Sequence, residues 1–316
     1  MANIKELSTR REGLAPGHRL CGGCGAAIAV RQVLLSADPE KYDIVVGNAT
    51  GCLEVSTSIF PYSSWNVPWI HNAFENAGAT TSGVEAAFKA LQRAGKIPAE
   101  KKIKFVAFGG DGGTYDIGLQ SLSGAMERGH DMVYVCYDNG AYMNTGIQRS
   151  SATPKGAWAT TSEVGKCQLG KPQVRKDLTS IMAAHGIKYC AQTTVGHWTD
   201  LTKKAEKAIE VDGPAFLNVL APCPRGWRLA SDQTAEICRL AVNSKFWPLF
   251  EIEDGKWTLT PVREKNLVPL EDFLKPQGRF KHLFKPGSEA LLQEMKDDVE
   301  AYWKYLEGRV EGSKDL

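Results

Sequence analysis

Two short polar strings in the middle of the chain contain the residue types that bind a divalent cation and a phosphate. The first, "FGGDGGTYDIG" at residues 108–118, follows an apolar run and places Asp111 among glycines. Glycines let the backbone approach a phosphate closely, whereas a carboxylate repels a phosphate unless a divalent cation bridges the two. The second string, "DNGAYMNTG" at residues 138–146, follows the next apolar run. This separation fits one βαβ unit, so Asp111 and Asn139 should meet at the carboxyl ends of neighbouring strands. Their oxygens predict a site for Mg²⁺ and a diphosphate.

Three other interpretations of the glycine string have to be compared with a Mg²⁺ site. A dinucleotide-binding fingerprint has the pattern G-x-G-x-x-G with an acidic residue about 20 positions later, whereas the acidic residue here lies inside the loop. A G-x-x-x-x-G-K-[ST] phosphate loop does not occur in the sequence. A tight structural turn in which Asp111 caps a helix stays open, because spacing alone does not distinguish it from a metal site.

The string "CGGCG" at residues 21–25 contains a cysteine pair whose chemistry the spacing leaves open. A C-x-x-C pair can form a redox disulfide, provide half of a zinc site or bind an iron-sulfur cluster. The chain contains eight cysteines, which favour metal or redox use over a disulfide framework in a long chain of a reducing compartment. We interpret four as ordinary core or surface residues, namely Cys136, Cys167, Cys190 and Cys238. The other four are Cys21, Cys24, Cys52 and Cys223.

The composition is that of a globular protein with a large core. Of 316 residues, 43% are hydrophobic and 23% charged, and the net charge of +2 indicates no nucleic-acid partner. No apolar run approaches the roughly 18 to 20 residues that a membrane span needs, and the polar N-terminus lacks the apolar segment of a signal peptide. We therefore expect a cytoplasmic protein without a membrane contact.

Short β-rich runs alternate with helical patterns through the first two thirds of the chain. Strands are predicted at 42–48, 103–110, 132–139, 187–193 and 214–223, and helices at 83–95, 116–129, 177–186 and 198–211. This alternation predicts an α/β fold with a mostly parallel sheet and helices on both faces. The segment 140–173 is rich in Gly, Ser, Thr and Pro, and an irregular segment of that length is more often functional than accidental. A hairpin at 247–260 and a long amphipathic helix at 288–310 should follow.

Several longer strings resemble one family. They are "HRLCGGCGA", "ATGCLEVSTS", "HNAFENAGATTSGVE", "FGGDGGTYDIGLQSLSGAMERGH", "YDNGAYMNTGIQRS" and "PCPRGW". Together they resemble the β subunit of the pyruvate:ferredoxin oxidoreductase family of 2-oxoacid oxidoreductases, from about Gly17 to the C-terminal helix. The resemblance implies the thiamine diphosphate-binding fold. It also implies three parts: an N-terminal segment 1–39 with the cluster-binding cysteine pair, a cofactor-binding domain 40–230, and a C-terminal extension 231–316 that packs on the domain or on partner subunits.

The resemblance also implies the residues of two cofactor sites. One 4Fe-4S cluster would bind Cys21, Cys24, Cys52 and Cys223. Mg²⁺ would bind Asp111, Asn139 and the backbone carbonyl of Ala141. Thiamine diphosphate would contact the surrounding residues Thr50, Gly51, Cys52, Gly110, Gly112, Gly113, Asn144, Thr145 and Gly146, with Asn144 facing the substrate as the candidate catalytic residue. Family members often have "CPGCG" and "DNEGY" where this chain has "CGGCG" and "DNGAY". The second change lies beside the Mg²⁺ site and leaves the identity of the substrate open.

The activity that the resemblance implies is oxidative decarboxylation of a 2-oxoacid, with pyruvate as the expected substrate. Electrons would leave through the cluster toward ferredoxin. Indolepyruvate, 2-oxoglutarate, 2-oxoisovalerate and oxalate are alternatives, and oxalate would need no CoA. The chain contains no C-x₂-C-x₂-C run, so a ferredoxin-like subunit should hold further clusters. An α subunit should supply the glutamate that activates thiamine and much of the substrate pocket, which makes this chain inactive alone. A zinc-stabilised scaffold and a nicotinamide-dependent dehydrogenase are the alternatives from other classes.

Overall fold

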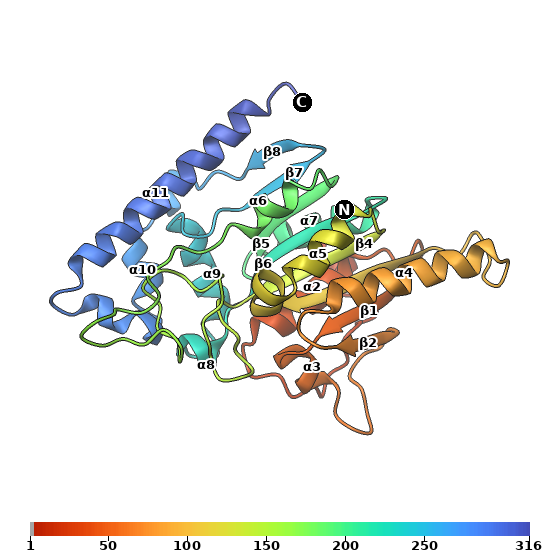
Figure 1. Ribbon diagram of the computed structural model, residues 1–316, viewed down its shortest axis with the longest axis horizontal. Coiled ribbons are helices and arrows are strands. Elements are labelled where there is room, and N and C mark those ends of the chain that lie inside the picture. Colours follow the sequence, from red (N-terminus) through yellow and green to blue (C-terminus); the bar gives the residue numbers. More distant parts are fainter. Residues whose placement is uncertain (1–2) are drawn as a thin grey trace.

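Six parallel strands form the centre of the computed structural model, which describes residues 3–316 (Figure 1). They are β1 (Asp43–Ala49), β2 (Trp69–Asn72), β3 (Ile103–Gly110), β4 (Met132–Asp138), β5 (Tyr189–Thr194) and β6 (Ala215–Leu220). Two antiparallel strands, β7 (Phe250–Glu253) and β8 (Lys256–Leu259), complete the sheet in the order β2-β1-β3-β4-β6-β5-β7-β8. The prediction of a mostly parallel sheet is confirmed.

Helices cover both faces of this sheet, as predicted. One face packs against α2 (Gly25–Ser36) and α7 (Trp198–Glu210), which contribute buried side chains such as Val30, Leu34 and Leu201. The opposite face packs against α4 (Ala77–Arg93), α5 (Leu119–Glu127) and α6 (Leu178–Ala183), with Leu122, Met126 and Met182 in the core. Because β3, β4 and β6 are buried on both faces, they are almost uniformly apolar along their length.

The C-terminal third builds a separate apolar cluster and extends the sheet. The predicted hairpin is β7–β8, and it adds to the edge strand β5. The predicted long helix is α11 (Glu289–Gly312), blue in Figure 1, which packs against β8. Beside them the chain forms the short helices α8 (Pro224–Trp227), α9 (Thr234–Asn243), α10 (Leu270–Leu274), η2 (Glu264–Asn266) and η3 (Gly278–Phe284), most of which enclose a third core around Trp227, Trp247 and Phe273.

Several boundaries differ from those predicted. Helix α4 begins at Ala77, whereas the predicted start was residue 83. The first turns were missed in the prediction because their small residues show no apolar period. These small residues are needed for close packing, since a Cβ atom on Gly78 would lie 3.2 Å from the backbone of Leu122 in α5. Strand β2, the short helices α1 (Ile4–Leu7) and α3 (Cys52–Thr57), and helix α2 are further elements that were not predicted from the sequence. Within residues 3–316, no helix has the length and apolar character needed to cross a membrane.

Candidate functional site

The predicted meeting of Asp111 and Asn139 is confirmed. Strands β3 and β4 are parallel neighbours in which Gly110 pairs with Tyr137, so Asp111 and Asn139 leave the sheet at the same edge. The Asp111 side chain is completely buried, and Asn139 is 8% exposed. The backbone N–H of Asn139 donates to Asp111 Oδ1 over 3.2 Å, and the Ser150 hydroxyl donates to Oδ2 over 2.5 Å. The 28-residue spacing therefore corresponds to one βαβ unit.

The glycines after Asp111 are required by close approaches of other groups. They form a π-helical turn, η1 (Gly112–Ile117), that joins β3 to α5. A Cβ atom on Gly112 would overlap the Tyr142 ring, and one on Gly113 would lie 2.6 Å from the carbonyl oxygen of Phe74. Asp111 precedes this turn, yet its side chain makes no capping hydrogen bond to it. The helix-capping alternative is therefore wrong.

Three oxygen atoms converge beside the turn. The side-chain amide oxygen of Asn139 faces Asp111 Oδ1 at 3.0 Å and the carbonyl oxygen of Ala141 at 2.9 Å. Such an arrangement is repulsive unless the amide turns round to donate from its nitrogen or a cation lies between the oxygens. Ligands at right angles on Mg²⁺, with metal–oxygen distances of about 2.1 Å, lie about 3.0 Å apart. The same distances are those of two hydrogen bonds once the amide has turned round, so the spacing is compatible with a magnesium site but does not by itself require one.

The electrostatic environment of Asp111 also fits a cation. Burial, followed by the nearby charge of Asp138, raises the pKa of the Asp111 carboxyl well above its usual value near 3.8. The hydrogen bonds from Ser150 and from the Asn139 backbone oppose this increase but are too weak to cancel it. A divalent ion held by Asp111 would replace the missing positive charge and favour the carboxylate.

A linkage between pH and Mg²⁺ binding follows from this raised pKa. The folded chain without metal should lose stability as pH rises from about 3.8 through the raised pKa, because the buried carboxyl must ionise. Mg²⁺ needs the ionised form, so its affinity should rise with pH and its binding should release up to about one proton per chain. Calorimetry in buffers with different ionisation enthalpies measures this proton release. Asp111→Asn is the control, and equal release from wild type and this variant would contradict the expectation.

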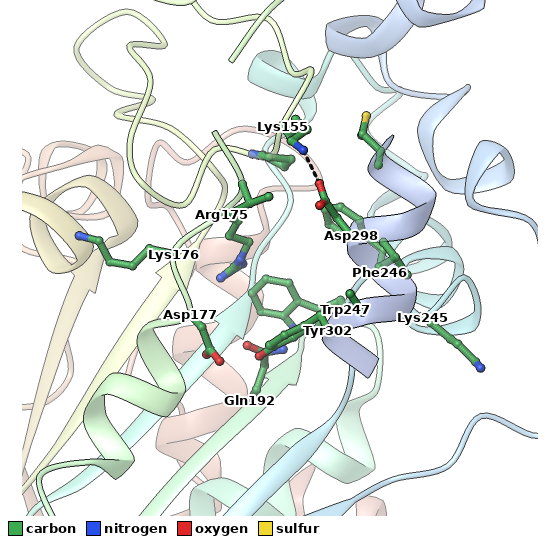
Figure 2. Close-up of a pocket in the computed structure, with 15 residues that line it drawn as sticks. Lys155, Arg175, Lys176, Asp177, Gln192, Lys245, Phe246, Trp247, Asp298 and Tyr302 are labelled. Carbon is green, nitrogen blue, oxygen red and sulfur yellow. Dashed lines mark ion pairs between the residues drawn. The ribbon is translucent and has the colours of Figure 1, made fainter. Parts of the chain in front are cut away.

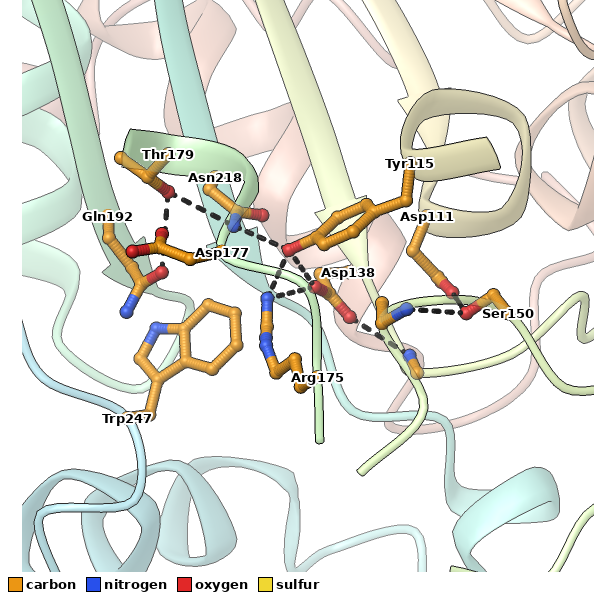
Figure 3. Close-up of polar contacts among 12 residues, drawn as sticks. Asp111, Tyr115, Asp138, Ser150, Arg175, Asp177, Thr179, Gln192, Asn218 and Trp247 are labelled. Carbon is orange, nitrogen blue, oxygen red and sulfur yellow. Dashed lines mark hydrogen bonds and ion pairs between the residues drawn. The ribbon is translucent and has the colours of Figure 1, made fainter. Parts of the chain in front are cut away.

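A buried network lies behind Asp111, shown in Figure 3. Asp138 accepts hydrogen bonds from Arg175 and from the Tyr115 hydroxyl, both over 2.7 Å, and from the Gly140 N–H over 3.0 Å. The Arg175 guanidinium stacks on the Trp247 ring with 4.1 Å to its centroid. Arg175 was not predicted as a site residue, because it lies 37 residues after its partner in an irregular segment. The network fixes the backbone of residues 138–140 and therefore the position of Asn139.

Removing the guanidinium should strongly destabilise the fold. Arg175→Met leaves Asp138 buried and unpaired beside Asp111, and breaking a buried ion pair costs about 3–5 kcal/mol of unfolding free energy. Urea denaturation measures the loss. The exposed pair Arg239–Glu236 provides the control, because Arg239→Met should cost at most about 1 kcal/mol. A loss below about 1 kcal/mol in Arg175→Met would contradict the assignment.

A small open pocket lies directly above these oxygens. Its lining residues are Thr50, Gly51, Cys52, Phe74, Gly110, Gly112, Gly113, Tyr137, Asn139, Ala141, Tyr142, Met143 and Asn144. Nine of the residues expected around the cofactor are in this set, which also contains Phe74, Tyr137, Tyr142 and Met143. Asp111 is completely buried and does not line the pocket itself. Thr145 and Gly146 belong to the adjoining turn, where the Gly146 N–H donates to the Met143 carbonyl over 3.3 Å.

The four cysteines selected from the sequence come together beside this pocket. Cys24 precedes α2, Cys52 begins α3 and Cys223 precedes α8, while Cys21 lies on the exposed loop before Cys24. The Gly25 N–H donates to the Pro222 carbonyl over 3.0 Å, which holds the loop of the cysteine pair against the segment of Cys223. Cys52 reaches the same place because it follows shortly after β1, which ends at Ala49 beside β3.

The thiols influence one another electrostatically. Burial is the largest cause that raises the pKa of the Cys24, Cys52 and Cys223 thiols, and the charges of the other cysteines raise it further, to about 12 for Cys52. Within residues 3–316, no three His, Cys, Asp or Glu side chains are placed to hold one metal ion. A 4Fe-4S cube gives each thiolate its own iron, so its four ligands are spaced more widely than those of a single ion. The four cysteines therefore fit a cluster in number and in chemistry.

The other four cysteines have the ordinary positions expected for them. Cys136, Cys190 and Cys238 are completely buried in the apolar cores, and Cys167 is exposed.

A separate cavity of about 300 Å³ lies between α11 and the loop of Arg175 (Figure 2). Several polar groups around it already bond to the protein: Lys155 pairs with Asp298 at 2.6 Å, Gln192 donates to the Pro248 carbonyl over 2.9 Å, and the Trp247 indole donates to the Thr193 carbonyl over 2.8 Å. These engaged groups offer a ligand little to bind. The pocket beside Asp111 and Cys52 is the better candidate site.

Comparisons with known proteins agree with this choice. Residues 46–219 match the family model described as the C-terminal binding domain of thiamine pyrophosphate enzymes. The chain is 52% identical to pyruvate synthase subunit PorB of Thermotoga maritima, over 99% of this chain and 98% of that one. It is 45% identical to ketoisovalerate oxidoreductase subunit VorB of Pyrococcus abyssi, over 94% of each chain. A solved 2-oxoglutarate:ferredoxin oxidoreductase from Magnetococcus marinus has a similar fold, with a TM-score of 0.55 and 23% identity over 69% of this chain and 71% of that one.

Proposed function

Since the chain belongs to the thiamine pyrophosphate enzymes and, among them, to the family of pyruvate synthase PorB subunits, we propose that it is the cofactor-binding subunit of a 2-oxoacid:ferredoxin oxidoreductase. Pyruvate is the proposed substrate. One observation carries the proposal: Cys52 lines the same pocket as Gly110, Asn139 and Ala141, so the proposed thiamine and cluster sites would share a wall. An enzyme that removes electrons from a thiamine-bound substrate needs this proximity.

The residues at the carboxyl ends of β3 and β4 would bind the diphosphate end of the cofactor. Asp111, Asn139 and the Ala141 carbonyl would hold Mg²⁺, as their oxygen spacing allows. Gly112 and Gly113 have no side chains, so the backbone beside that ion stays accessible to the diphosphate. Asn144, at the rim of the same pocket, is the proposed substrate contact. The Arg175–Asp138 pair would act from behind as a positioning group for Asn139.

Thiamine diphosphate, when bound, supplies the nucleophile and the electron sink that decarboxylation of a 2-oxoacid requires. A 4Fe-4S cluster on Cys21, Cys24, Cys52 and Cys223 would accept the electrons one at a time. The chain's own contribution would be to hold these groups in fixed positions and to exclude water from the space between them. All eight cysteines are free, which fits the reducing cytoplasm as the proposed location.

Partner subunits belong to the proposal because the pocket is incomplete. Its enclosed space is only about 30 Å³, and none of the thirteen lining residues is acidic. The larger part of the cofactor must therefore face another chain, which would supply the activating glutamate. A ferredoxin-like subunit would pass the electrons to external ferredoxin.

Turnover by the anaerobically co-purified complex tests this function. A panel of 2-oxoacids and oxalate, with and without CoA, would be assayed with a viologen dye as electron acceptor. We expect CoA-dependent reduction with pyruvate. Preference for 2-oxoisovalerate is the second candidate, because the relative from Pyrococcus abyssi is named as a ketoisovalerate oxidoreductase subunit. A complex without thiamine diphosphate and without iron would refute the proposal, and a colourless zinc protein would favour the scaffold alternative.

A further inference from the structure

The hydroxyl group of Tyr137 has no partner in the interior of the protein. Tyr137 is the sixth residue of β4 and is 2% exposed. No atom of residues 3–316 forms a hydrogen bond with its hydroxyl. The other tyrosine hydroxyls of this region are satisfied, that of Tyr134 by Thr114 at 3.1 Å and that of Tyr115 by Asp138 at 2.7 Å. A buried, unpaired hydroxyl costs about 1–3 kcal/mol, so this group is expected to have an acceptor outside the chain.

The direction of the Tyr137 side chain indicates where that acceptor lies. Side chains alternate along β4, and Tyr137 shares the face of Val133 and Val135, whereas Tyr134 and Cys136 point to the opposite face. The face of Tyr137 is the one covered by α2, which starts directly after Cys24. The ring therefore points toward the part of the molecule that contains the cysteines.

The hydroxyl lies next to Cys52. A Cβ atom on Gly51 would be 2.8 Å from the Tyr137 oxygen, and Gly51 directly precedes Cys52. Both residues line the candidate pocket together with Tyr137. The phenolic O–H of a tyrosine is a hydrogen-bond donor at neutral pH.

We propose that the Tyr137 hydroxyl donates a hydrogen bond to the sulfur cage of the cluster, on the side held by Cys52, and thereby raises its reduction potential. This inference rests on the proposed cluster. Reduction adds negative charge to the cage, and a hydrogen bond to a charged acceptor is stronger than one to a neutral acceptor. The donor therefore stabilises the reduced form more than the oxidised form, as hydrogen bonds to cluster sulfurs generally do. Tyr137 is a positioning residue for electron transfer.

An electron paramagnetic resonance redox titration of the anaerobic complex tests the inference. In Tyr137→Phe, the reduced-to-oxidised ratio of one cluster should fall about tenfold at a fixed potential, which corresponds to about 59 mV for a one-electron couple. Iron content and thiamine diphosphate affinity should stay at their wild-type values. Tyr134→Phe is the matched control, because it removes a hydroxyl from the same strand on the opposite face and should leave every potential unchanged.

A second variant covers the case in which Tyr137→Phe loses its cluster. Site-specific replacement of Tyr137 by 3-fluorotyrosine keeps the shape and strengthens the donor, so the same potential should rise. An unchanged potential in both variants would overturn the inference while leaving the proposed function intact. Unchanged potential together with weaker thiamine diphosphate binding in Tyr137→Phe would also overturn it, and would assign the hydroxyl to the thiamine cofactor. A wild-type complex without iron would refute the proposed function itself.

Discussion

Asp111→Ala is expected to weaken Mg²⁺-dependent binding of thiamine diphosphate at least about 100-fold, or about 2.7 kcal/mol. The variant removes the only charged member of the three converging oxygens, and the Asn139 amide and the Ala141 carbonyl are neutral. Without a carboxylate the ion would lose its strongest ligand and the diphosphate its bridge to the protein. Calorimetric titration of the co-purified complex with thiamine diphosphate, at saturating Mg²⁺, measures the effect.

The stability of the fold separates this effect from simple unfolding. Asp111→Ala removes a buried carboxyl whose pKa is raised by burial and by Asp138, but it also leaves the Ser150 hydroxyl and the Asn139 N–H without their acceptor. The metal-free variant should therefore lose at most about 1–3 kcal/mol of unfolding free energy and remain folded. The visible absorption of the cluster should persist, since the four cysteines are untouched. Asp116→Asn is the control in the same π-helical turn, because Asp116 accepts the Ser151 N–H at 3.0 Å and does not line the pocket. Retained Mg²⁺-dependent affinity in Asp111→Ala would remove this residue from the metal site.

The part of the site that the sequence could predict is the part that local rules determine. Consecutive parallel strands in a βαβ unit must be joined by a crossover, so a strand, a glycine turn, a helix and a second strand fix where Asp111 and Asn139 emerge. Ala141 follows two residues after Asn139 and is carried with it. For the same reason the sheet itself could be predicted from the alternation of apolar runs.

The supporting residues could not be found in this way. Arg175 reaches Asp138 from an irregular segment, and the Asn218 amide donates to the Tyr115 hydroxyl, 103 residues away in the sequence. Such contacts depend on how separate elements pack, which no periodicity records. Tyr137 was hidden for a different reason: within an apolar strand it looks like one more core residue, and only its unpaired hydroxyl distinguishes it. The resemblance to a family identified ligands but not the groups that position them.

Cys52 connects the two halves of the site. It is the one candidate cluster ligand that also lines the pocket of the glycine turn, and it starts a helix at the end of β1, beside β3. In the proposed function, the two centres would therefore be held by adjacent strand ends of one sheet. This arrangement would keep the distance for electron transfer constant when partner subunits move.

Cys52→Ala is consequently expected to separate the two cofactors. The variant complex should lose iron from this one cluster and the corresponding part of the broad sulfur-to-iron absorption at about 400 nm, because an iron corner without its thiolate is labile. Viologen reduction should fall at least about 100-fold, equivalent to about 2.7 kcal/mol, while thiamine diphosphate affinity changes little, since Asp111, Asn139 and Ala141 remain. Iron analysis, visible spectra and calorimetry on the same preparation measure all three.

The exposed residue Cys167 supplies the matched control, because Cys167→Ala removes a thiol far from any apolar core and should keep both iron and activity. Loss of iron in both variants would indicate general instability of the cluster during purification. Full iron content in Cys52→Ala would show that Cys52 is not a ligand. The pocket and the proposed cluster site would then have no residue in common. Loss of thiamine affinity together with iron would instead show that the pocket depends on the cluster for its shape, which the independent anchoring of β3 and β4 argues against.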